Sequence, residues 1–271
     1  MAGILRKLSM LVVLASWSAQ ALAGAAAPRI LVVGNSLSYV NNLPALFNAL
    51  AKLPAAGGLA HAELIAAPGG SIAERWDEGV VARELQSGRW NVLVLQERGG
   101  LLACLGKPGT AESGECPASV KAHQNFARLG KQLGVRVILL GTWGPDSIWQ
   151  GQLSRGLRRL STLTGAEALD AGALVRTYGK SHPATPMYSD AILHPRIEAS
   201  LLVAMALLRR VRGSLPGASD LAIEGMMPPA DAHPSAQALM SEQPGLGVAD
   251  SPTIIPESRL APLLEAASTS P

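Results

Sequence analysis

The sequence predicts a three-layer α/β/α domain built on a parallel sheet of about five strands. Short apolar runs alternate along the chain with longer segments whose apolar residues recur every three or four positions. The short runs are typical of strands buried on both faces, and the longer segments are typical of helices that cover a sheet. Because parallel neighbours need crossover connections, this alternation predicts helices on both faces of the sheet.

Each expected strand is a short apolar run that stops at a glycine or at small or polar residues. The five runs are residues 29–34, 61–66, 91–96, 135–140 and 167–171, of which the last is the weakest. The expected helices are residues 42–53, 72–87, 120–133, 148–163 and 196–211. Gly134 and Gly165 follow two of these helices, and glycine commonly terminates a helix.

The two ends of the chain differ in composition from its centre. Residues 1–23 start with basic residues, continue with an apolar run and end in small residues, which is typical of a cleaved signal peptide. A retained membrane anchor is the disfavoured alternative, because the run is shorter than the ~20 apolar residues that span a bilayer. Residues 24–212 form the expected α/β domain. Residues 213–271 are rich in Pro, Ala, Ser and Gly and predict a loosely packed extension that can be partly disordered.

The charge balance and the absence of phosphate-binding motifs argue against a nucleic-acid partner and against a cofactor. The chain has 23 Lys and Arg against 20 Asp and Glu, and without Arg6 and Lys7 the balance is 21 against 20. No basic cluster stands out, so no nucleic-acid partner is expected. The chain lacks a Gly-x-Gly-x-x-Gly fingerprint and a Gly-Lys-Ser/Thr phosphate loop. A cofactor-binding protein is therefore the least favoured reading, and no cofactor is expected.

The two cysteines, Cys104 and Cys116, flank a segment that contains Gly, Pro, Thr and Ser. In an exported protein this pattern predicts a disulfide that closes a surface loop, with two free thiols as the alternative. A metal site needs about four ligands, and the Cys and His spacing does not supply them, so no metal is expected. The signal peptide pattern predicts export to the periplasm or the extracellular space, with no stable membrane anchor.

The first strand ends in Gly34, Asn35 and Ser36, which leaves a hydroxyl at the carboxyl edge of the sheet. Open α/β sheets bind their ligands at this edge. Ser36 is therefore the candidate nucleophile of an acyl-transfer reaction. The alternative is that a polar residue in this block only caps the following helix, as Asn35 or Ser38 could equally do.

The second and third strands end in groups that suit an oxyanion. Gly69 and Gly70 follow the second strand at the start of a helix, where backbone N–H groups favour negative charge. Ser71 as the helix N-cap is the simpler reading, and both can hold together. Gln96 ends the third strand and could donate from its side-chain amide, whereas Glu97 and Arg98 beyond it could form a solvated turn pair.

Five histidines are candidates for the base. His61, His123 and His182 have less suitable settings, in a strand, on a helix and in a loop without an evident partner. His194 follows Asp190 by four residues and precedes a strongly apolar helix, which can hold its loop firmly. We therefore favour His194 with Asp190 as its orienting carboxylate, and His233, two residues after Asp231, is the rival.

The order of these blocks resembles the SGNH/GDSL hydrolase superfamily. The matching blocks are Gly34-Asn35-Ser36, Gly69-Gly70, Gln96-Glu97 and Asp190 to His194-Pro195. The resemblance covers about residues 29–212 and implies a flavodoxin-like fold. It implies that Ser36 is the nucleophile and donates through its own N–H, that Gly70 or Gly69 is the second donor, and that His194 is the base.

The sequence departs from the superfamily pattern at two points. The third donor is usually an asparagine, whereas this chain has Gln96. The Asp and His are usually three residues apart, whereas Asp190 and His194 are four apart, so Ser189 or a backbone carbonyl could orient the ring instead.

Together these features predict an exported serine esterase that acts through an acyl-enzyme on Ser36. The expected substrates are small-molecule or polysaccharide esters, including O-acetyl groups of polysaccharide and other envelope esters. Trp143 and Trp149 could stack on a sugar or line an acyl pocket. The alternative function is a catalytically inactive carbohydrate- or ligand-binding protein on the same scaffold.

Overall fold

Five parallel strands form the central sheet of the protein, in the order β2-β1-β3-β4-β5. We describe a computed structural model over residues 27–54 and 60–269. The strands are β1 (Arg29–Gly34), β2 (His61–Ala66), β3 (Val92–Gln96), β4 (Arg136–Leu140) and β5 (Glu167–Leu169). The predicted fold class is confirmed, and the predicted signal peptide lies outside the described residues.

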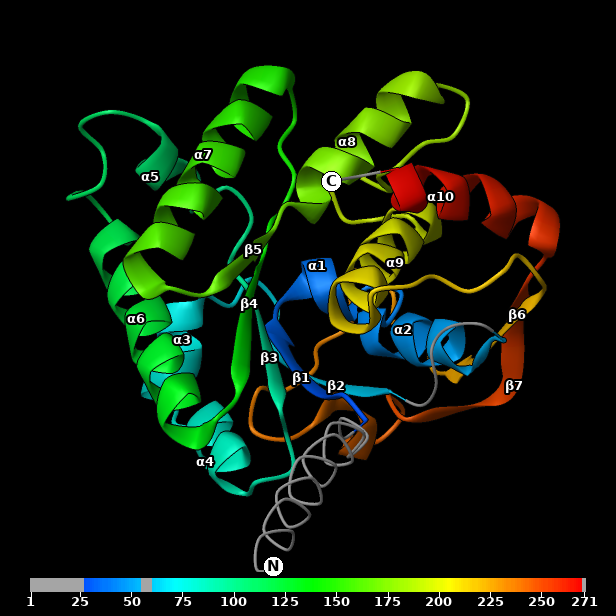
Figure 1. Ribbon diagram of the computed structural model, residues 1–271, viewed down its shortest axis with the longest axis horizontal. Helices are drawn as coiled ribbons and strands as arrows, with labels where there is room; N and C mark the ends of the chain where they lie inside the picture. The colour runs from blue at the N-terminus through cyan, green and yellow to red at the C-terminus, as the bar shows by residue number, and fades with distance from the viewer. Residues whose placement is uncertain (1–26, 55–59, 270–271) are drawn as a thin grey trace, which may run out of the picture.

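Helices cover both faces of the sheet (Figure 1). A separate apolar cluster fills each interface between the sheet and its helices. The helices that contribute to the first cluster are α2 (Leu43–Lys52), α8 (Ala171–Ser181), α9 (Ile197–Arg212) and α10 (Glu257–Thr269). Those of the second are α3 (Ile72–Asp77), α4 (Val80–Gln86), α5 (Ala103–Gly106), α6 (Cys116–Leu133) and α7 (Ser147–Thr164). Alternate side chains of β1 enter opposite clusters, Ile30 and Val32 the first and Leu31 and Val33 the second. This explains why the strands read as continuous apolar runs.

Two helical segments differ from the expected boundaries. The predicted helix at 72–87 is divided into α3 and α4 at Gly79, whose backbone is left-handed at φ 70°. The segment after β5 forms α8, which the sequence analysis does not separate from its surroundings; Asp170 caps this helix by accepting from Ala173 N–H at 3.2 Å. Gly134 and Gly165 end α6 and α7 in left-handed conformations, as predicted.

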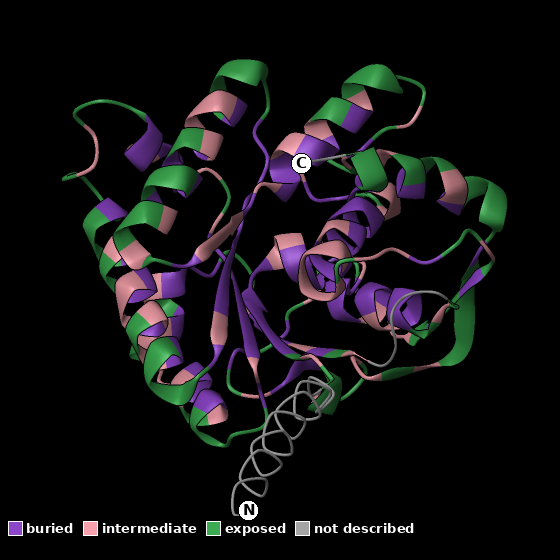
Figure 2. Cartoon of the chain, viewed as in Figure 1, coloured by how far each residue is buried: buried purple, intermediate pink, exposed green. Residues whose placement is uncertain are grey.

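The segment after α9 is ordered and contributes to the core, which corrects the expectation of a loosely packed extension at 213–271. Over its described part, β6 (Leu221–Gly225) and β7 (Val248–Ile255) form an antiparallel ribbon, and α10 follows. Leu221, Ile223 and Leu260 are fully buried in the first cluster, whereas most of β7 is exposed (Figure 2). The physical reason is that a few well-spaced apolar residues suffice to anchor a segment whose connections stay irregular. Such spacing gives only a weak local signal.

A disulfide joins Cys104 in α5 to Cys116 at the start of α6 and confirms the predicted pairing. It closes the exposed excursion that follows β3. Within residues 27–54 and 60–269, no helix is long and apolar enough to cross a membrane.

Candidate active site

Ser36 stands at the carboxyl end of β1, as the first residue of the short helix α1 (Ser36–Tyr39). Asn35 caps this helix by accepting from Leu37 N–H at 3.1 Å. A Cβ at Gly34 would lie 2.5 Å from Gln96 Oε1, so only glycine fits under this turn. At the first position of a helix the backbone N–H has no intrahelical acceptor. The Ser36 N–H is therefore left pointing out of the helix start, beside its own hydroxyl.

Asn35 connects the loops after β1 and β2. Its Nδ2 donates to Gly70 O at 2.9 Å, and its Oδ1 also accepts from Gln96 Nε2 at 3.2 Å. The side chain is buried, with 2% of the residue exposed, so these bonds form away from water. Asn35 therefore fixes the position of the glycine turn relative to Ser36.

Gln96 is not available as an oxyanion donor, which corrects the sequence-based prediction. Its Nε2 donates to Asn35 Oδ1 and to Glu97 O, so both amide hydrogens are used. Its Oε1 accepts from Asn35 N–H at 3.2 Å and from Ser38 Oγ at 2.8 Å. Gln96 is 2% exposed and does not line the pocket that contains Ser36. Gln96 instead stabilises the turn after β1 through its hydrogen bonds to Asn35 and Ser38, which it reaches because β3 neighbours β1 in the sheet.

The glycine turn after β2 presents Gly69 rather than Gly70 to the pocket. Gly70 N–H donates to Ala67 O at 3.2 Å, whereas Gly69 lines the pocket with a left-handed backbone at φ 61°. The sequence analysis named Gly70 or Gly69 as the second donor; in the structure the Gly70 N–H is used inside the turn, and Gly69 lies on the pocket wall. Ser71 is the N-cap of α3 in a capping box with Glu74, so the simpler reading of this serine also holds.

Asp190 and His194 form a closed loop before α9. Asp190 Oδ2 lies 2.6 Å from His194 Nδ1, and Asp190 Oδ1 accepts from His194 N–H at 3.0 Å and from Ile192 N–H at 3.1 Å. Ser189 instead contacts the carbonyl of His194 through both its N–H and its hydroxyl. Asp190, and not Ser189, therefore orients the imidazole, despite the four-residue spacing.

The extra residue of the loop is accommodated at Leu193. Its φ of 67° is left-handed, which is uncommon for a residue with a branched side chain. Trp143, from the loop after β4, donates its indole N–H to Leu193 O at 2.8 Å, and its ring stacks on Tyr188 at the start of the loop. Trp143 thus holds both ends of the segment that presents His194.

The Trp143→Phe variant is expected to lose the indole hydrogen bond and keep the ring stacking. We expect a loss of about 1 kcal/mol in unfolding free energy and a fall of roughly tenfold in kcat, because a freed Leu193 lets the imidazole shift. Urea denaturation and ester kinetics measure the two effects. Trp90→Phe is the matched control, since Trp90 is equally buried and its indole donates to Glu84, away from the pocket. Equal kcat losses in both variants would contradict a positioning role for Trp143.

Ser36 and His194 line the same pocket, which has a volume of about 380 Å³. Its walls come from the loops after four strands and from the loop before α9: Asn35, Ser36, Leu37, Gly69, Arg98, Gly99, Gly100, Trp143, Gly144, Pro145, Trp149, Ile192, Leu193 and His194. No hydrogen bond joins the Ser36 hydroxyl to His194, whose Nδ1 contacts Asp190; hydrogen bonds between a nucleophile and its base are often long before the substrate binds. His233 is exposed and does not line this pocket.

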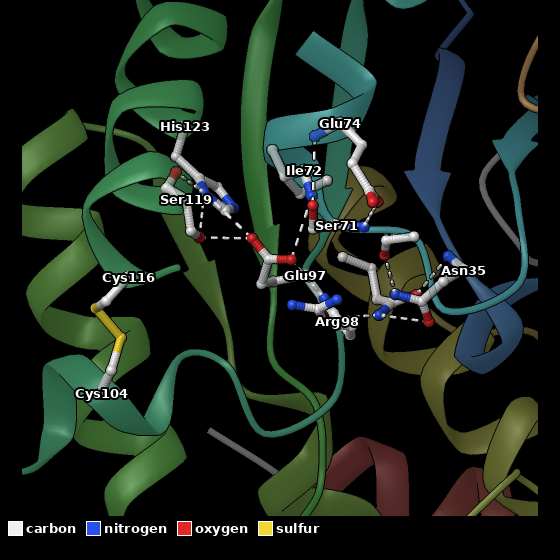
Figure 3. Close-up of polar contacts among 12 residues, drawn as sticks. Asn35, Ser71, Ile72, Glu74, Glu97, Arg98, Cys104, Cys116, Ser119 and His123 are labelled. Atoms are coloured by element: carbon white, nitrogen blue, oxygen red, sulfur yellow. Dashed lines mark hydrogen bonds and ion pairs between the residues drawn. A yellow bond between two sulfur atoms is a disulfide. The ribbon is translucent and has the colours of Figure 1, made fainter. Parts of the chain in front are cut away.

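Glu97 is the main functional candidate whose setting the sequence analysis misses. It is 1% exposed rather than part of a solvated turn pair, and it joins three elements. Its Oε1 accepts from Ile72 N–H at the start of α3 and from Arg98 N–H, and its Oε2 accepts from Ser119 Oγ in α6 at 2.5 Å (Figure 3). The glycine turn precedes Ile72, and the Gly99–Gly100 wall follows Arg98. Glu97 therefore anchors two of the pocket's loops from behind.

His123 lies beside Glu97 in the same buried cluster. Its Nδ1 is 2.8 Å from Ser119 O and 3.9 Å from Glu97 Oε2. Desolvation lowers the pKa of His123, against the opposing effects of Glu97 and of the Ser119 carbonyl. Because a carbonyl oxygen only accepts hydrogen bonds, the Nδ1–H of His123 donates to Ser119 O. Its burial away from the pocket excludes it as the base for Ser36.

The comparisons with known proteins show likeness at the level of structure. No protein-family model matches the chain, and no curated protein matches its sequence significantly. LAE5, an alpha/beta hydrolase enzyme from the metagenome of Lake Arreo, superimposes with a TM-score of 0.51 and 17% identity over 71% of this chain and 98% of that one. TesA superimposes with a TM-score of 0.51 and 16% identity, over 68% of this chain and 98% of TesA. BT4096, a gut microbial diltiazem-metabolizing enzyme, superimposes with a TM-score of 0.49 and 14% identity. The match covers 69% of this chain but only 47% of BT4096.

The chain shares the fold of LAE5 and TesA, with a parallel sheet between two helical layers. LAE5 and TesA are matched along almost their whole length, and the resemblance predicted from the sequence blocks is confirmed at the level of the fold. At this identity the likeness concerns the fold, and the chemistry is argued from the residues of the pocket.

Proposed function

We propose that this protein is an exported serine esterase that hydrolyses carboxylic esters through an acyl-enzyme on Ser36. One observation supports this most directly: the Ser36 hydroxyl and an imidazole braced by Asp190 line one pocket at the carboxyl edge of the sheet. Export is supported by the Cys104–Cys116 disulfide, since disulfides persist in oxidising compartments, and by the signal peptide predicted for residues 1–23.

In the proposed reaction, His194 Nε2 takes the proton of Ser36 as Oγ attacks the ester carbonyl. The carbonyl oxygen becomes an oxyanion that accepts from the N–H groups of Ser36 and Gly69. Asp190 holds the ring by its Nδ1–H and stabilises the imidazolium. The imidazolium then protonates the departing alkoxide, so the alcohol leaves and the acyl group stays on Ser36. Water, deprotonated by the same imidazole, then attacks the acyl carbonyl; the bond from the carbonyl carbon to Ser36 Oγ breaks, the imidazolium returns its proton to Oγ, and the carboxylic acid leaves.

A fluorophosphonate probe tests the proposal without knowledge of the natural ester, because it reacts with activated serines. We expect labelling of the folded protein, with the modified peptide mapping to Ser36, and no labelling after heat denaturation. Labelling at another serine would overturn the assignment of the nucleophile. Absence of labelling in the folded protein would favour the alternative, a ligand-binding protein on this scaffold.

Asp190 gives the proposed site a defined pH dependence. Partial desolvation alone would raise the pKa of Asp190, but hydrogen bonds from the His194 backbone and ring and from Ile192 N–H outweigh it and hold that pKa below its ordinary 3.8. A carboxyl with a lowered folded-state pKa adds stability above its unfolded pKa and loses it as the pH falls through the folded value.

The Asp190→Asn variant is therefore expected to melt at a lower temperature than the wild type at pH 6. The gap in Tm should shrink as the pH falls below about 3.8, because the wild-type carboxyl then takes up its proton. Thermal denaturation of both proteins at pH 6, 4, 3 and 2 measures this gap. A gap that stays constant across the series would show that Asp190 carries no depressed pKa.

A further inference from the structure

The pocket around Ser36 is apolar well beyond the reacting groups. Beside Ser36 and His194, its side-chain walls are mainly hydrophobic, and two large apolar residues of the walls are exposed to solvent. They are Trp149 at 41% and Ile192 at 74% relative exposure. Exposed apolar residues gathered at a site, rather than scattered singly, mark a binding surface.

Backbone hydrogen bonds fix the segments that carry Trp149 and Ile192. Asp146 caps α7 by accepting from Trp149 N–H at 2.8 Å. The Trp149 ring edge would lie 3.9 Å from a Cβ at Gly100, so the indole lies over the wall that follows β3. Ile192 N–H donates to Asp190, the same carboxylate that orients His194. The apolar mouth is therefore built from the first turn of α7 and from the loop that carries His194.

The pocket walls offer few side-chain hydrogen bonds to the hydroxyl groups of a sugar. Recognition of a saccharide depends on several polar groups placed to meet its hydroxyls. Among the described wall residues, the polar side-chain groups besides Asn35, Ser36 and His194 are two indole N–H groups, of which that of Trp143 donates to Leu193 O, and the Arg98 guanidinium, which is paired with Glu115. Asn35 uses both its Oδ1 and its Nδ2 inside the protein. The walls thus match an apolar group better than a hydroxylated one.

We propose that the natural substrate is an ester with an apolar group of several carbons next to the scissile bond, which packs against Trp149 and Ile192, rather than an O-acetylated sugar. The inference rests on the proposed esterase function and adds its substrate class. Burial of each further methylene in such a pocket strengthens binding, so rates should rise with chain length until the pocket is filled.

The test is a series of esters with the purified wild-type protein. One arm varies the acyl group in p-nitrophenyl acetate, butyrate, hexanoate and octanoate, and a second varies the alcohol in ethyl, butyl and hexyl acetate. We expect kcat/KM to rise on the order of tenfold or more from the shortest to the best member of at least one arm. Acetylated xylo-oligosaccharide, as the sugar competitor, should be turned over more slowly than that member.

Two variants connect the preference to the named residues. Trp149→Ala and Ile192→Ser should each lower kcat/KM for the best long ester several-fold more than for the shortest ester, because the short ester does not reach the mouth. Leu163→Ala is the matched control: Leu163 is on the same helix α7, is 46% exposed and lies outside the pocket. This control should leave the whole profile unchanged.

The outcomes separate the inference from the proposed function. Ester turnover that depends on Ser36 but is flat with chain length, or fastest on the acetylated sugar, would overturn the substrate class and keep the esterase. A chain-length preference that both mouth variants leave intact would also overturn the role of Trp149 and Ile192. Absence of Ser36-dependent turnover of every ester would instead overturn the proposed function itself.

Discussion

Replacing Ser36 with Ala is expected to lower kcat for ester hydrolysis by at least about 10⁴-fold, to the limit of detection. Removal of the nucleophile eliminates the acyl-enzyme route, and removal of a serine nucleophile in comparable sites costs on the order of 10⁶ in kcat. The short side chain lines an open pocket and carries no structural hydrogen bond among the described residues, so folding should be unaffected. Steady-state hydrolysis of p-nitrophenyl butyrate, with circular dichroism for folding, measures the result.

The rival histidine, His233, which like His194 precedes a proline, provides a matched control for the base. His194→Ala should reduce kcat nearly as strongly as Ser36→Ala, because nucleophile and base act as one unit whose effects are not additive. His233→Ala should retain wild-type kcat, since His233 is exposed and outside the pocket. Full activity in the Ser36 variant, or loss of activity in the His233 variant with retention in the His194 variant, would contradict the proposed site.

Replacing Glu97 with Leu is expected to have the largest effect on stability, a loss of about 4 kcal/mol in unfolding free energy. The change leaves two backbone N–H groups, of Ile72 and Arg98, and the Ser119 hydroxyl without their buried acceptor. Each unsatisfied buried group costs roughly 1–3 kcal/mol. Urea denaturation followed by fluorescence measures the loss, and a marginal protein could fail to fold altogether.

Glu97→Gln keeps the prediction testable if the Leu variant does not fold. The amide retains one acceptor oxygen for the two backbone N–H groups, so the expected loss is smaller, about 1–2 kcal/mol. Glu74→Leu is the control: Glu74 also accepts from a backbone N–H, of Ser71 at 2.7 Å, but its side chain is 55% exposed to solvent. A cost for Glu97→Leu no greater than that of Glu74→Leu would contradict the role of Glu97 as a buried anchor.

Much of the fold could be predicted because its signals are local. Buried strands between two helical layers must be apolar at every position, and helix ends at Gly134 and Gly165 need a residue that tolerates a left-handed backbone. The parallel order and the two-layer covering follow from the need for crossovers. The prediction was wrong for the segment after α9, whose order depends on contacts with elements distant in the sequence. The ribbon β6–β7 and α10 are ordered because a few of their apolar residues pack into the core formed by other elements.

The site divides in the same way. Residue type and position at strand ends were enough to select Ser36, Asp190 and His194 as candidates, and their catalytic roles stay predictions. The hydrogen-bond partner of each polar group could not be predicted from the sequence. Gln96 and Glu97 are adjacent in the sequence, yet the Gln96 amide donates to Asn35 in the turn after β1, whereas the Glu97 carboxylate accepts from Ser119 in α6, in the opposite layer. Successive residues at a strand end face opposite sides, and which groups wait there depends on distant segments.

By itself, the sequence determined the sheet with its two covering layers, the cysteine pair and the edge at which a hydroxyl and an imidazole were to be sought. Only the tertiary structure decided that Gly69 rather than Gly70 faces the pocket, that Asp190 reaches the imidazole across four residues, and that an apolar mouth surrounds them. Periodicity and helix caps act between neighbours in the chain. Hydrogen bonds, in contrast, form between whichever groups the packed layers bring within about 3 Å.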